Sequence, residues 1–147
     1  METPKIYMDI CSFNRPFDNQ TQLKIRMETE VKLFIQSGIR DKKYLMVWSY
    51  MHDYENSENP YDEKREAIAP WKELASKYCS SSDDIPTAGQ RIMMLGIKAK
   101  DSLHLACALM SGCDYFITTD KKLLNKTVDG LRIINPIDFV REMEDLI

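Results

Sequence analysis

The sequence predicts an α/β fold, a three-layer α/β/α sandwich with a mainly parallel central sheet. Short runs rich in β-branched and aromatic residues alternate along the chain with longer segments that have helical spacing. The run YLMVWS (44–49) is continuously apolar, as expected of a strand buried on both faces. Such alternation favours parallel strands joined by helices that cover both faces of the sheet.

The first half of the chain supplies two strands and most of the expected helical residues. The run KIYM (5–8) predicts a strand that ends at an acid, and 44–49 predicts the next. Between them, segment 19–38 is expected to be a helix that Gly38 ends. Its expected apolar face consists of Leu23, Met27, Val31 and Phe34. Segment 50–79 is expected to be largely helical, with breaks at NSENP (56–60) and at Pro70.

The second half of the chain repeats this alternation of strands and helices, and its helices have clearer capping residues at their ends. Segment 86–98 predicts a helix with Pro86 near its start, and 101–112 predicts another that begins at Asp101. Gly112 is expected at the C-terminal cap of the second helix. The runs YFITT (115–119) and LRIIN (131–135) predict strands. A last helix follows them, with Asn135 as N-cap and Pro136 as its first residue.

Composition and length indicate one ordinary globular domain spanning residues 1–147, because no repeat, linker or low-complexity tract divides the chain. The formal net charge of -3 argues against a protein that coats nucleic acid by charge. No apolar run is long enough for a signal peptide or a membrane span. The four cysteines have no zinc-site spacing, so we expect buried thiols in a reducing, cytoplasmic setting and no membrane contact.

Two aspartates bracket the segment DSLHLACALMSGCDYFITTD and are expected to meet in space. A helix of about ten residues from Asp101 rises roughly 15 Å before Gly112 turns the chain. The following strand returns about five residues, or roughly 16 Å, to Asp120. Because the outward and return lengths nearly match, the two carboxylates should lie at the same end of the sheet.

Two further acids are expected at that end. Asp9 follows the first strand, and Glu55 lies early in the helix entered from the second strand. Right-handed crossovers place the carboxyl ends of parallel strands on one edge, where α/β proteins bind ligands. Crowded carboxylates take up protons or bind cations, and oxygen ligands favour Mg²⁺ or Mn²⁺ over zinc.

Each acid can also be explained by a structural role, without a metal site. The first residue of a helix is often an aspartate that only caps it, and Asp120 suits a turn. Asp53 and Glu58 compete with Glu55 by position. An acid that ends a buried strand, as Asp9 does, seldom lacks a partner.

Three stretches resemble the PIN domain family of metal-dependent nucleases, and more narrowly the toxin ribonucleases of bacterial toxin–antitoxin pairs. They are KAKDSLHLACALMSGCDYFITTDKKLL (98–124), IYMDICSFNRPFD (6–18) and VWSYMHDYENSENP (47–60). The resemblance implies a PIN-like fold and an endoribonuclease that cleaves RNA with metal-activated water. It also implies a homodimer and an antitoxin protein as partner.

The resemblance assigns roles residue by residue. The acids that match the catalytic, metal-holding positions for one or two Mg²⁺ or Mn²⁺ ions are Asp9, Glu55, Asp101 and Asp120. Thr119 matches a hydroxyl-bearing position beside the last acid, and Ser49 matches a serine at helix entry. Ile10 departs from the family pattern, in which Thr or Ser commonly follows the first acid, so Ser12 or Asn14 is expected to supply that polar group.

Basic and aromatic residues around these acids have two interpretations each. Arg15, Lys100 and Lys121 are candidates for substrate binding, and together with Lys98, Lys122 and Lys126 they form either a rim for phosphates or an ordinary solvated surface. A catalytic base at His104 or His52 is conceivable, but both histidines are expected to pack in the core. The aromatic residues that could stack on nucleobases, but are also expected in the core, are Trp48, Tyr54 and Trp71.

Two other classes of function compete with the nuclease. A phosphoryl-transfer enzyme with an aspartyl nucleophile needs a second Asp two residues after Asp9, but position 11 is Cys. A receiver-like or inert PIN-like domain would bind a partner and regulate it without catalysis. Receiver domains expect adjacent acids after the first strand, whereas Asp9 follows Met8.

Overall fold

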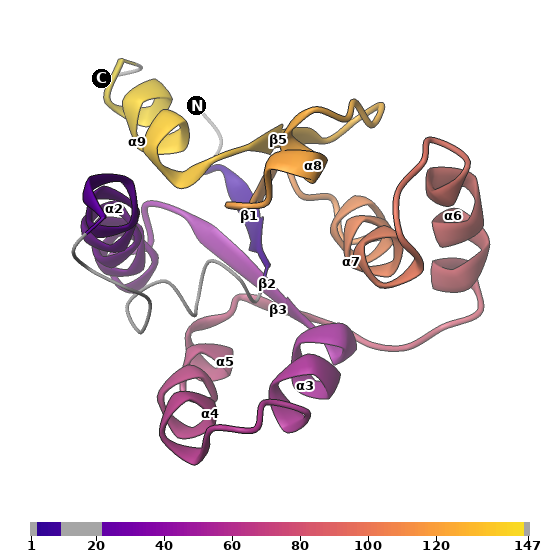
Figure 1. Cartoon of the computed structure of the whole chain (residues 1–147), viewed down its shortest axis with the longest axis horizontal. Helices are drawn as coiled ribbons and strands as arrows, with labels where there is room; N and C mark the ends of the chain where they lie inside the picture. The colour runs from indigo at the N-terminus through magenta and orange to yellow at the C-terminus, as the bar shows by residue number, and fades with distance from the viewer. Residues whose placement is uncertain (1–2, 10–21, 146–147) are drawn as a thin grey trace.

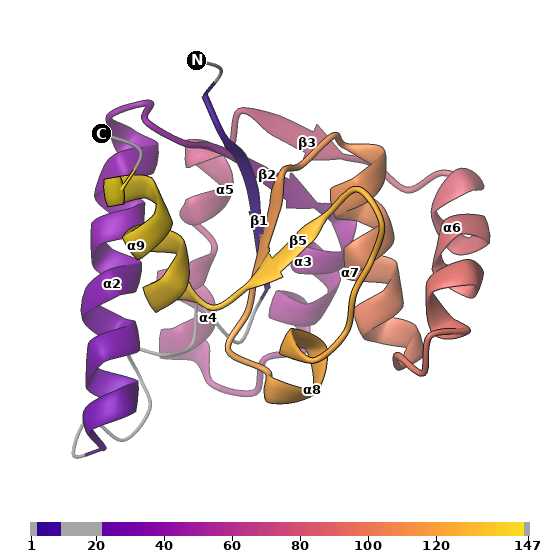
Figure 2. The same ribbon diagram turned by 90° about the horizontal axis from the view of Figure 1, so that it is seen from above.

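The computed structural model describes residues 3–9 and 22–145, which form a parallel sheet between two layers of helices (Figures 1 and 2). The five strands of this described part are β1 (Lys5–Met8), β2 (Leu45–Ser49), β3 (Lys77–Cys79), β4 (Tyr115–Ile117) and β5 (Arg132–Ile134). Their order is β3-β2-β1-β4-β5, and all four pairs of neighbours are parallel. The predicted α/β/α sandwich is confirmed.

The strand order reverses next to β1. From β1 the chain adds β2 and β3 on one side, and it then returns to add β4 and β5 on the other side. Met8 of β1 is level with Ile117 of β4, so these two central strands end together. Ligands of open α/β sheets bind at such a reversal, outside the carboxyl ends of the strands.

Helices cover both faces of the sheet. They are α2 (Leu23–Arg40), α3 (Tyr50–Ser57), α4 (Asp62–Ile68), α5 (Trp71–Leu74), α6 (Asp84–Met93), α7 (Ala99–Met110), α8 (Lys121–Leu124) and α9 (Pro136–Asp145). Figure 1 shows α2 and α9 side by side on one face, with α7 and α6 on the other. Within the described residues, no helix combines the length and apolar character that crossing a membrane requires.

The core has two halves because successive strand residues point to opposite faces. Ile6 and Met8 of β1 belong to the half that contains Ile35 of α2 and Phe139 of α9. Tyr7, between them, points into the other half. The segment YLMVWS is buried on both faces as predicted, because Met46, Val47 and Trp48 are each at most 1% exposed.

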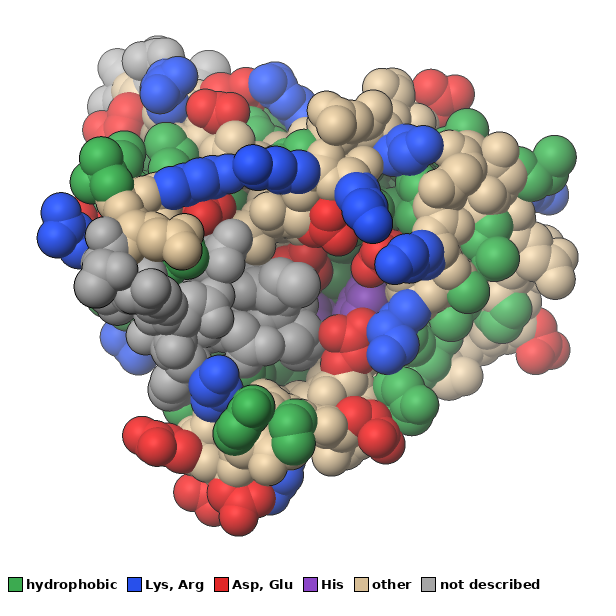
Figure 3. Space-filling model, viewed as in Figure 1, with side chains coloured by type: hydrophobic (Ala, Val, Ile, Leu, Met, Phe, Trp, Pro, Cys, Tyr) green, Lys and Arg blue, Asp and Glu red, His purple; other side chains and the backbone are tan. Residues whose placement is uncertain are grey.

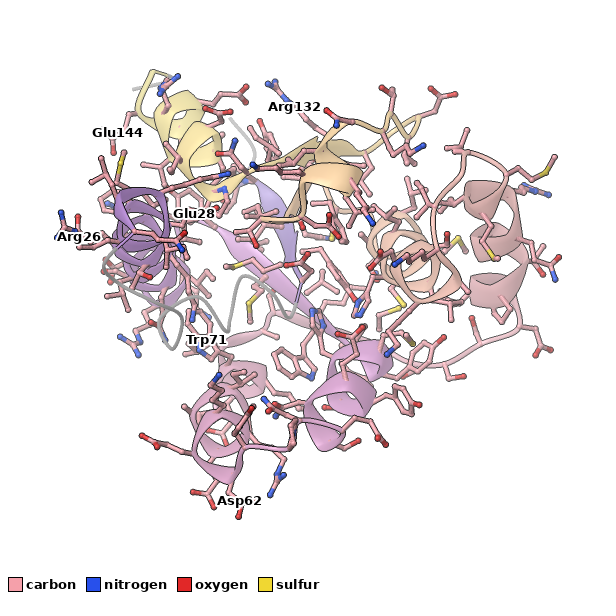
Figure 4. The ribbon with its side chains drawn as sticks, in the orientation of Figure 1. Arg26, Glu28, Asp62, Trp71, Arg132 and Glu144 are labelled. Atoms are coloured by element: carbon pink, nitrogen blue, oxygen red, sulfur yellow. The ribbon has the colours of Figure 1, made fainter. Side chains whose placement is uncertain are left out.

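The predicted face and end of α2 are wrong. Its expected apolar residues Leu23, Met27 and Phe34 are 63%, 43% and 47% exposed. The buried residues are Glu28, Lys32, Ile35, Gly38 and Ile39, which also recur with helical spacing. Figure 4 accordingly shows Arg26 on the outer side of α2 and Glu28 on the side that faces the rest of the molecule.

The helix continues through Gly38 because that glycine makes room for a ring. A Cβ atom built on Gly38 would lie 2.4 Å from Cε2 of Tyr44, so only glycine fits there. The residue therefore serves helix packing and not helix termination. Lys32 is buried nearby with Nζ 5.0 Å from the ring centroid of Trp71, and its burial lowers its pKa to about 8.

Other elements also differ from the prediction, among them the helix expected over 86–98, which spans Asp84–Met93. Residues Lys77–Cys79, expected to be helical, form the edge strand β3, and Lys121–Leu124 form the unexpected short helix α8. Helix α7 begins at Ala99, which makes Asp101 its third residue and not its first. The start of α9 is as predicted, because Oδ1 of Asn135 accepts a hydrogen bond of 2.8 Å from the backbone N–H three residues on.

Candidate functional site

Asp9 and Asp120 are linked through a threonine at the carboxyl edge of the two central strands. The backbone N–H of Asp9 donates to the carbonyl of Ile117 at 3.2 Å, which continues the pairing of β1 with β4. The Oγ1 hydroxyl of Thr118 donates to Oδ2 of Asp9, and it accepts a bond of 3.0 Å from the backbone N–H of Asp120. Thr118 thus holds the two acids in a fixed relation. Thr119, the expected supporting residue, is buried beside it.

Asp120 also caps a helix. Its Oδ1 atom accepts a hydrogen bond of 2.8 Å from the backbone N–H of Lys122 and so begins α8. A cap explains an aspartate at this position, but the side chain also lines a cleft of about 440 Å³. The charged residues of that cleft are Asp101, Asp120, Lys98, Lys122 and Lys126. The expected meeting of Asp101 with Asp120 is therefore found.

Asp101 lies half-buried in the first turn of α7, where other acids shift its pKa. Burial raises the pKa of Asp101, and the carboxylates of Asp120 and Glu55 raise that pKa further. His104 and Lys98 oppose this shift without cancelling it. Asp120 and Glu55, which come from distant segments, are therefore close enough to repel Asp101. Figure 3 shows acidic side chains and histidine in a hollow bordered by lysine and arginine.

The structure distinguishes Glu55 from Asp53. Oε1 of Glu55 lies 2.8 Å from Nε2 of His104, on the side of α3 that faces α7. Asp53 instead accepts hydrogen bonds from Trp48 Nε1 (2.8 Å), Tyr78 OH (2.6 Å) and Lys72 Nζ (3.2 Å). Burial favours a higher pKa for Asp53, but these three donors outweigh it and lower the pKa. Asp53 is therefore a structural anchor, and Glu55 belongs with the acids.

A buried chain of hydrogen bonds runs beneath Glu55. Oγ of Ser49 is 2.7 Å from the hydroxyl of Tyr7, which in turn contacts Nδ1 of His104. Ser49 also caps α3, as expected of a serine at helix entry. Its Oγ accepts from the backbone N–H of His52 at 3.3 Å, and its own N–H donates to His52 Nδ1 at 3.0 Å. His52 Nε2 donates to the carbonyl of Met8 at 2.6 Å.

The carboxylate at the end of this series of hydrogen bonds determines which atom is the donor in each bond. A carboxylate only accepts, so Nε2 of His104 carries the proton that points to Glu55. When this is the only proton on the ring, Nδ1 of His104 accepts from the hydroxyl of Tyr7, and that hydroxyl accepts from Ser49. Burial raises the pKa of Tyr7 well above its usual value, which keeps the phenol protonated. All these donors point toward Glu55.

The other predicted residues divide into four groups. His52, His104, Trp48 and Trp71 are buried, as expected of core residues. The expectation that Tyr54 packs in the core is wrong, because this residue is 53% exposed on α3. Lys100 and Lys121 are exposed beside the acids. The remaining candidates lie outside the described residues: Ile10, Ser12, Asn14 and Arg15.

The acids suit a hard divalent ion by their donor chemistry, although they are not assembled as a ligand set. Among the described residues, no group of three or more His, Cys, Asp or Glu side chains is arranged to hold a metal ion. Protein donors engage one oxygen each of Asp9, Asp120 and Glu55. An all-oxygen donor set whose members repel one another still favours Mg²⁺ or Mn²⁺.

Two residues that shape the site were not predicted, Tyr7 and Thr118. A phenol in the central strand β1 needs a buried polar partner, which is the signal that Tyr7 offers in the sequence. Thr118 directly precedes the predicted Thr119. Successive side chains of an extended segment point to opposite sides, and only the fold shows which of the two hydroxyls contacts Asp9.

Neither a scan against protein-family models nor a search of curated proteins finds a match for the chain. The function is therefore inferred from the site.

Proposed function

We propose that the chain is a metal-dependent endoribonuclease in which Asp9, Glu55, Asp101 and Asp120 hold one or two Mg²⁺ or Mn²⁺ ions. The observation that carries the proposal is that Asp101 and Asp120 line one cleft at the ligand-binding edge of the sheet, where burial, and then the carboxylates of Asp120 and Glu55, raise the pKa of Asp101. A bound cation relieves such repulsion. The resemblance of residues 98–124 to PIN domain nucleases supports the same reaction.

Different residues of the chain would contribute to different parts of the reaction. A divalent ion at the acids would stabilise charge on the phosphodiester and lower the pKa of the attacking water. Lys98, Lys122 and Lys126 line the cleft beside the acids and attract the phosphates that flank the scissile bond. The oxygen of water forms the new bond to phosphorus, and the bond to the leaving ribose oxygen breaks, so that this oxygen takes up a proton from solvent and leaves as a hydroxyl. A carboxylate or bulk water accepts the proton that water loses.

Asparagine variants of two acids test the proposal. Asp101→Asn and Asp120→Asn keep the size of the side chain and remove its charge, so Mn²⁺-dependent cleavage of RNA should fall by about 100-fold or more. Circular dichroism should remain unchanged. The matched control is Asp129→Asn, which removes an equal charge from an exposed residue outside the cleft. Full cleavage by both acid variants contradicts the proposal.

The resemblance to toxin ribonucleases extends the proposal to the partners. The chain would form a homodimer and be inhibited by an antitoxin protein. Light scattering measures the first, and recovery of RNA cleavage after removal of a co-purifying protein measures the second. A monomer that no protein inhibits would leave the nuclease proposal standing and remove the toxin role.

One observation favours an inert PIN-like or receiver-like domain that regulates a partner. Thr118, His104 and the N-terminus of α8 already engage oxygens of the acids, so the acids have partners without a cation. Calorimetric titration with Mn²⁺ separates the two functions. The nuclease binds Mn²⁺ and loses that binding in Asp101→Asn, whereas an inert domain shows no uptake that depends on Asp101.

A further inference from the structure

A second cavity, of about 330 Å³, lies beside the acids and is apolar. It is lined by Tyr50, Met51, Tyr54, Lys100 and Leu103, which come from α3 and α7. The ring of Tyr54 is 53% exposed, although tyrosine in a folded core is ordinarily covered. Nζ of Lys100 lies 5.9 Å from the centroid of that ring. The cavity thus combines a half-exposed aromatic residue with one cationic group that lies over its ring.

The cavity and the acids share the same two helices. Tyr54 directly precedes Glu55 in α3, and Lys100 directly precedes Asp101 in α7. Successive residues of a helix point about 100° apart, so one side of the helix pair presents the acids and the adjoining side presents the cavity. A ligand held at the acids therefore has the apolar cavity as its immediate neighbour.

Cationic side chains lie on both sides of the acids. Lys98, Lys122 and Lys126 belong to the cleft that contains Asp101 and Asp120. Lys100 belongs to the apolar cavity on the side of α3. Phosphates attract lysine, whereas the faces of nucleobases stack on aromatic rings and contact apolar walls. The order of groups across the surface is therefore lysines, acids, and an aromatic pocket with one lysine.

We propose that this second cavity is a nucleobase subsite, in which the base next to the scissile phosphate stacks on Tyr54 while Lys100 pairs with a phosphate. The proposal rests on the proposed nuclease function, because it takes the scissile phosphate to lie at the acids. Stacking accepts every base, since each has a π-face. The bound nucleotide must leave the stack of a duplex, so the subsite selects unpaired RNA.

Binding can be measured separately from cleavage. A trinucleotide of RNA with 2-aminopurine at one position is titrated with the full chain in EDTA, and its fluorescence reports stacking. Tyr54→Phe should keep the affinity within about twofold because the ring remains. Tyr54→Ser should weaken binding by about tenfold and abolish the fluorescence quenching, which matches the loss of one base–aromatic stack. An abasic trinucleotide should bind the wild type as weakly as the intact one binds Tyr54→Ser.

Tyr61 supplies the matched control. It is an exposed tyrosine, 61% accessible, with Nζ of Lys64 at 4.6 Å from its ring centroid, but it lies at the start of α4 outside both cavities. Tyr61→Ser should leave binding and quenching unchanged. Equal losses in Tyr54→Ser and Tyr61→Ser, or full affinity for the abasic trinucleotide, would overturn the subsite. Quenching that depends on Tyr54 in a protein without Mn²⁺-dependent cleavage would uphold the subsite and overturn the nuclease function.

Discussion

Nε2 of His104 lies 2.8 Å from Oε1 of Glu55, and the opposite ring nitrogen of His104 meets the hydroxyl of the buried Tyr7. The imidazole is therefore held from both sides, with only one tautomer that satisfies both contacts. This arrangement orients Glu55 toward the acids of α7 and α8, in the way that hydrogen-bonded partners orient the ligands of metal sites.

The tautomer of His104 is the first prediction. The chain contains two histidines, so the ring nitrogens of both can be followed by ¹⁵N NMR without extensive assignment. Both rings should carry their proton on Nε2, His104 toward Glu55 and His52 toward the carbonyl of Met8. Tyr7→Phe should weaken this preference in His104 alone, because its Nδ1 loses its donor while Glu55 still accepts from Nε2.

Tyr44→Phe provides the control for that experiment. Tyr44 is buried against Phe139 on the other half of the core, so its hydroxyl has no role in the chain beneath Glu55. The spectra of both histidines should remain as in the wild type. A wild-type His104 with its proton on Nδ1 would show that the donor order inferred here is wrong.

Glu55 and Asp53, two residues apart on α3, should behave in opposite ways. Glu55→Gln keeps a hydrogen-bonding oxygen beside His104 but removes a charge from the acids, so RNA cleavage should fall more than about tenfold with little change in stability. Asp53→Asn weakens the bonds from Trp48, Tyr78 and Lys72, and should cost about 1 kcal/mol of unfolding free energy.

Urea denaturation and a cleavage assay on the same two proteins measure both effects. Cleavage by Asp53→Asn should equal that of the wild type under conditions where the variant remains folded. If Asp53→Asn is the inactive variant and Glu55→Gln is fully active, the assignment of the two acids is reversed.

His52 should make the fold sensitive to acid. Burial is the main cause that lowers the pKa of His52, to about 3, and the neighbouring His104 lowers it further. The carbonyl of Met8 and the carboxylate of Asp53 oppose the shift without reversing it. The folded state thus binds fewer protons than the unfolded state between pH 6.5 and about 3. Stability is complete above pH 6.5, and a few kcal/mol are lost as the pH falls through that window.

His52→Gln removes this titration and keeps the hydrogen bonds. Glutamine is the ordinary partner of serine in a capping box, so its amide oxygen can accept from the N–H of Ser49. Urea midpoints measured from pH 7 to pH 4 should fall less steeply for the variant than for the wild type. Parallel curves for the two proteins would mean that another group causes the acid sensitivity.

The sequence predicts those parts of the fold in which a pattern repeats within one segment. Strand β2 is recognised because Met46, Val47 and Trp48 are all apolar, and α9 is recognised from its N-cap. Strand β3 has three residues, of which only Cys79 is buried, so it leaves no apolar run to detect. The predicted face of α2 is wrong because two sets of residues have helical spacing, and only packing against the rest of the core, including Tyr44 and α9, selects between them.

The candidate site also has a part that the sequence predicts and a part that it does not. Asp9, Asp101 and Asp120 could be placed at one edge from helix rise, strand rise and chain direction alone. Contacts such as Tyr7 with His104, which are 97 residues apart in sequence, depend on side-chain directions across two layers. No local pattern encodes such a contact. The exposure of Tyr54 likewise depends on how α3 packs in the folded molecule, which the spacing within one helix does not fix.

Gly38→Ala should destabilise the protein although alanine is the better helix former. The substitution gains up to about 1 kcal/mol from helix propensity, since Gly38 lies inside α2. The new Cβ atom, however, would lie 2.4 and 2.7 Å from Cε2 and Cδ2 of Tyr44, whose ring packs edge-to-face on Phe139 at 5.2 Å. The ring is part of the core and cannot move without opening that contact. Overpacking of this kind costs about 1–3 kcal/mol, so the net change should be a loss.

Two further variants separate the clash from the helix effect. Ser37→Ala changes the neighbouring exposed residue of α2 and should be neutral or slightly stabilising in urea denaturation. Gly38→Ala combined with Tyr44→Leu removes the ring that the methyl group meets, so the double variant should lose less than the sum of the two single losses. Strict additivity of the two changes, or a Gly38→Ala protein as stable as the wild type, would show that α2 does not approach Tyr44 this closely.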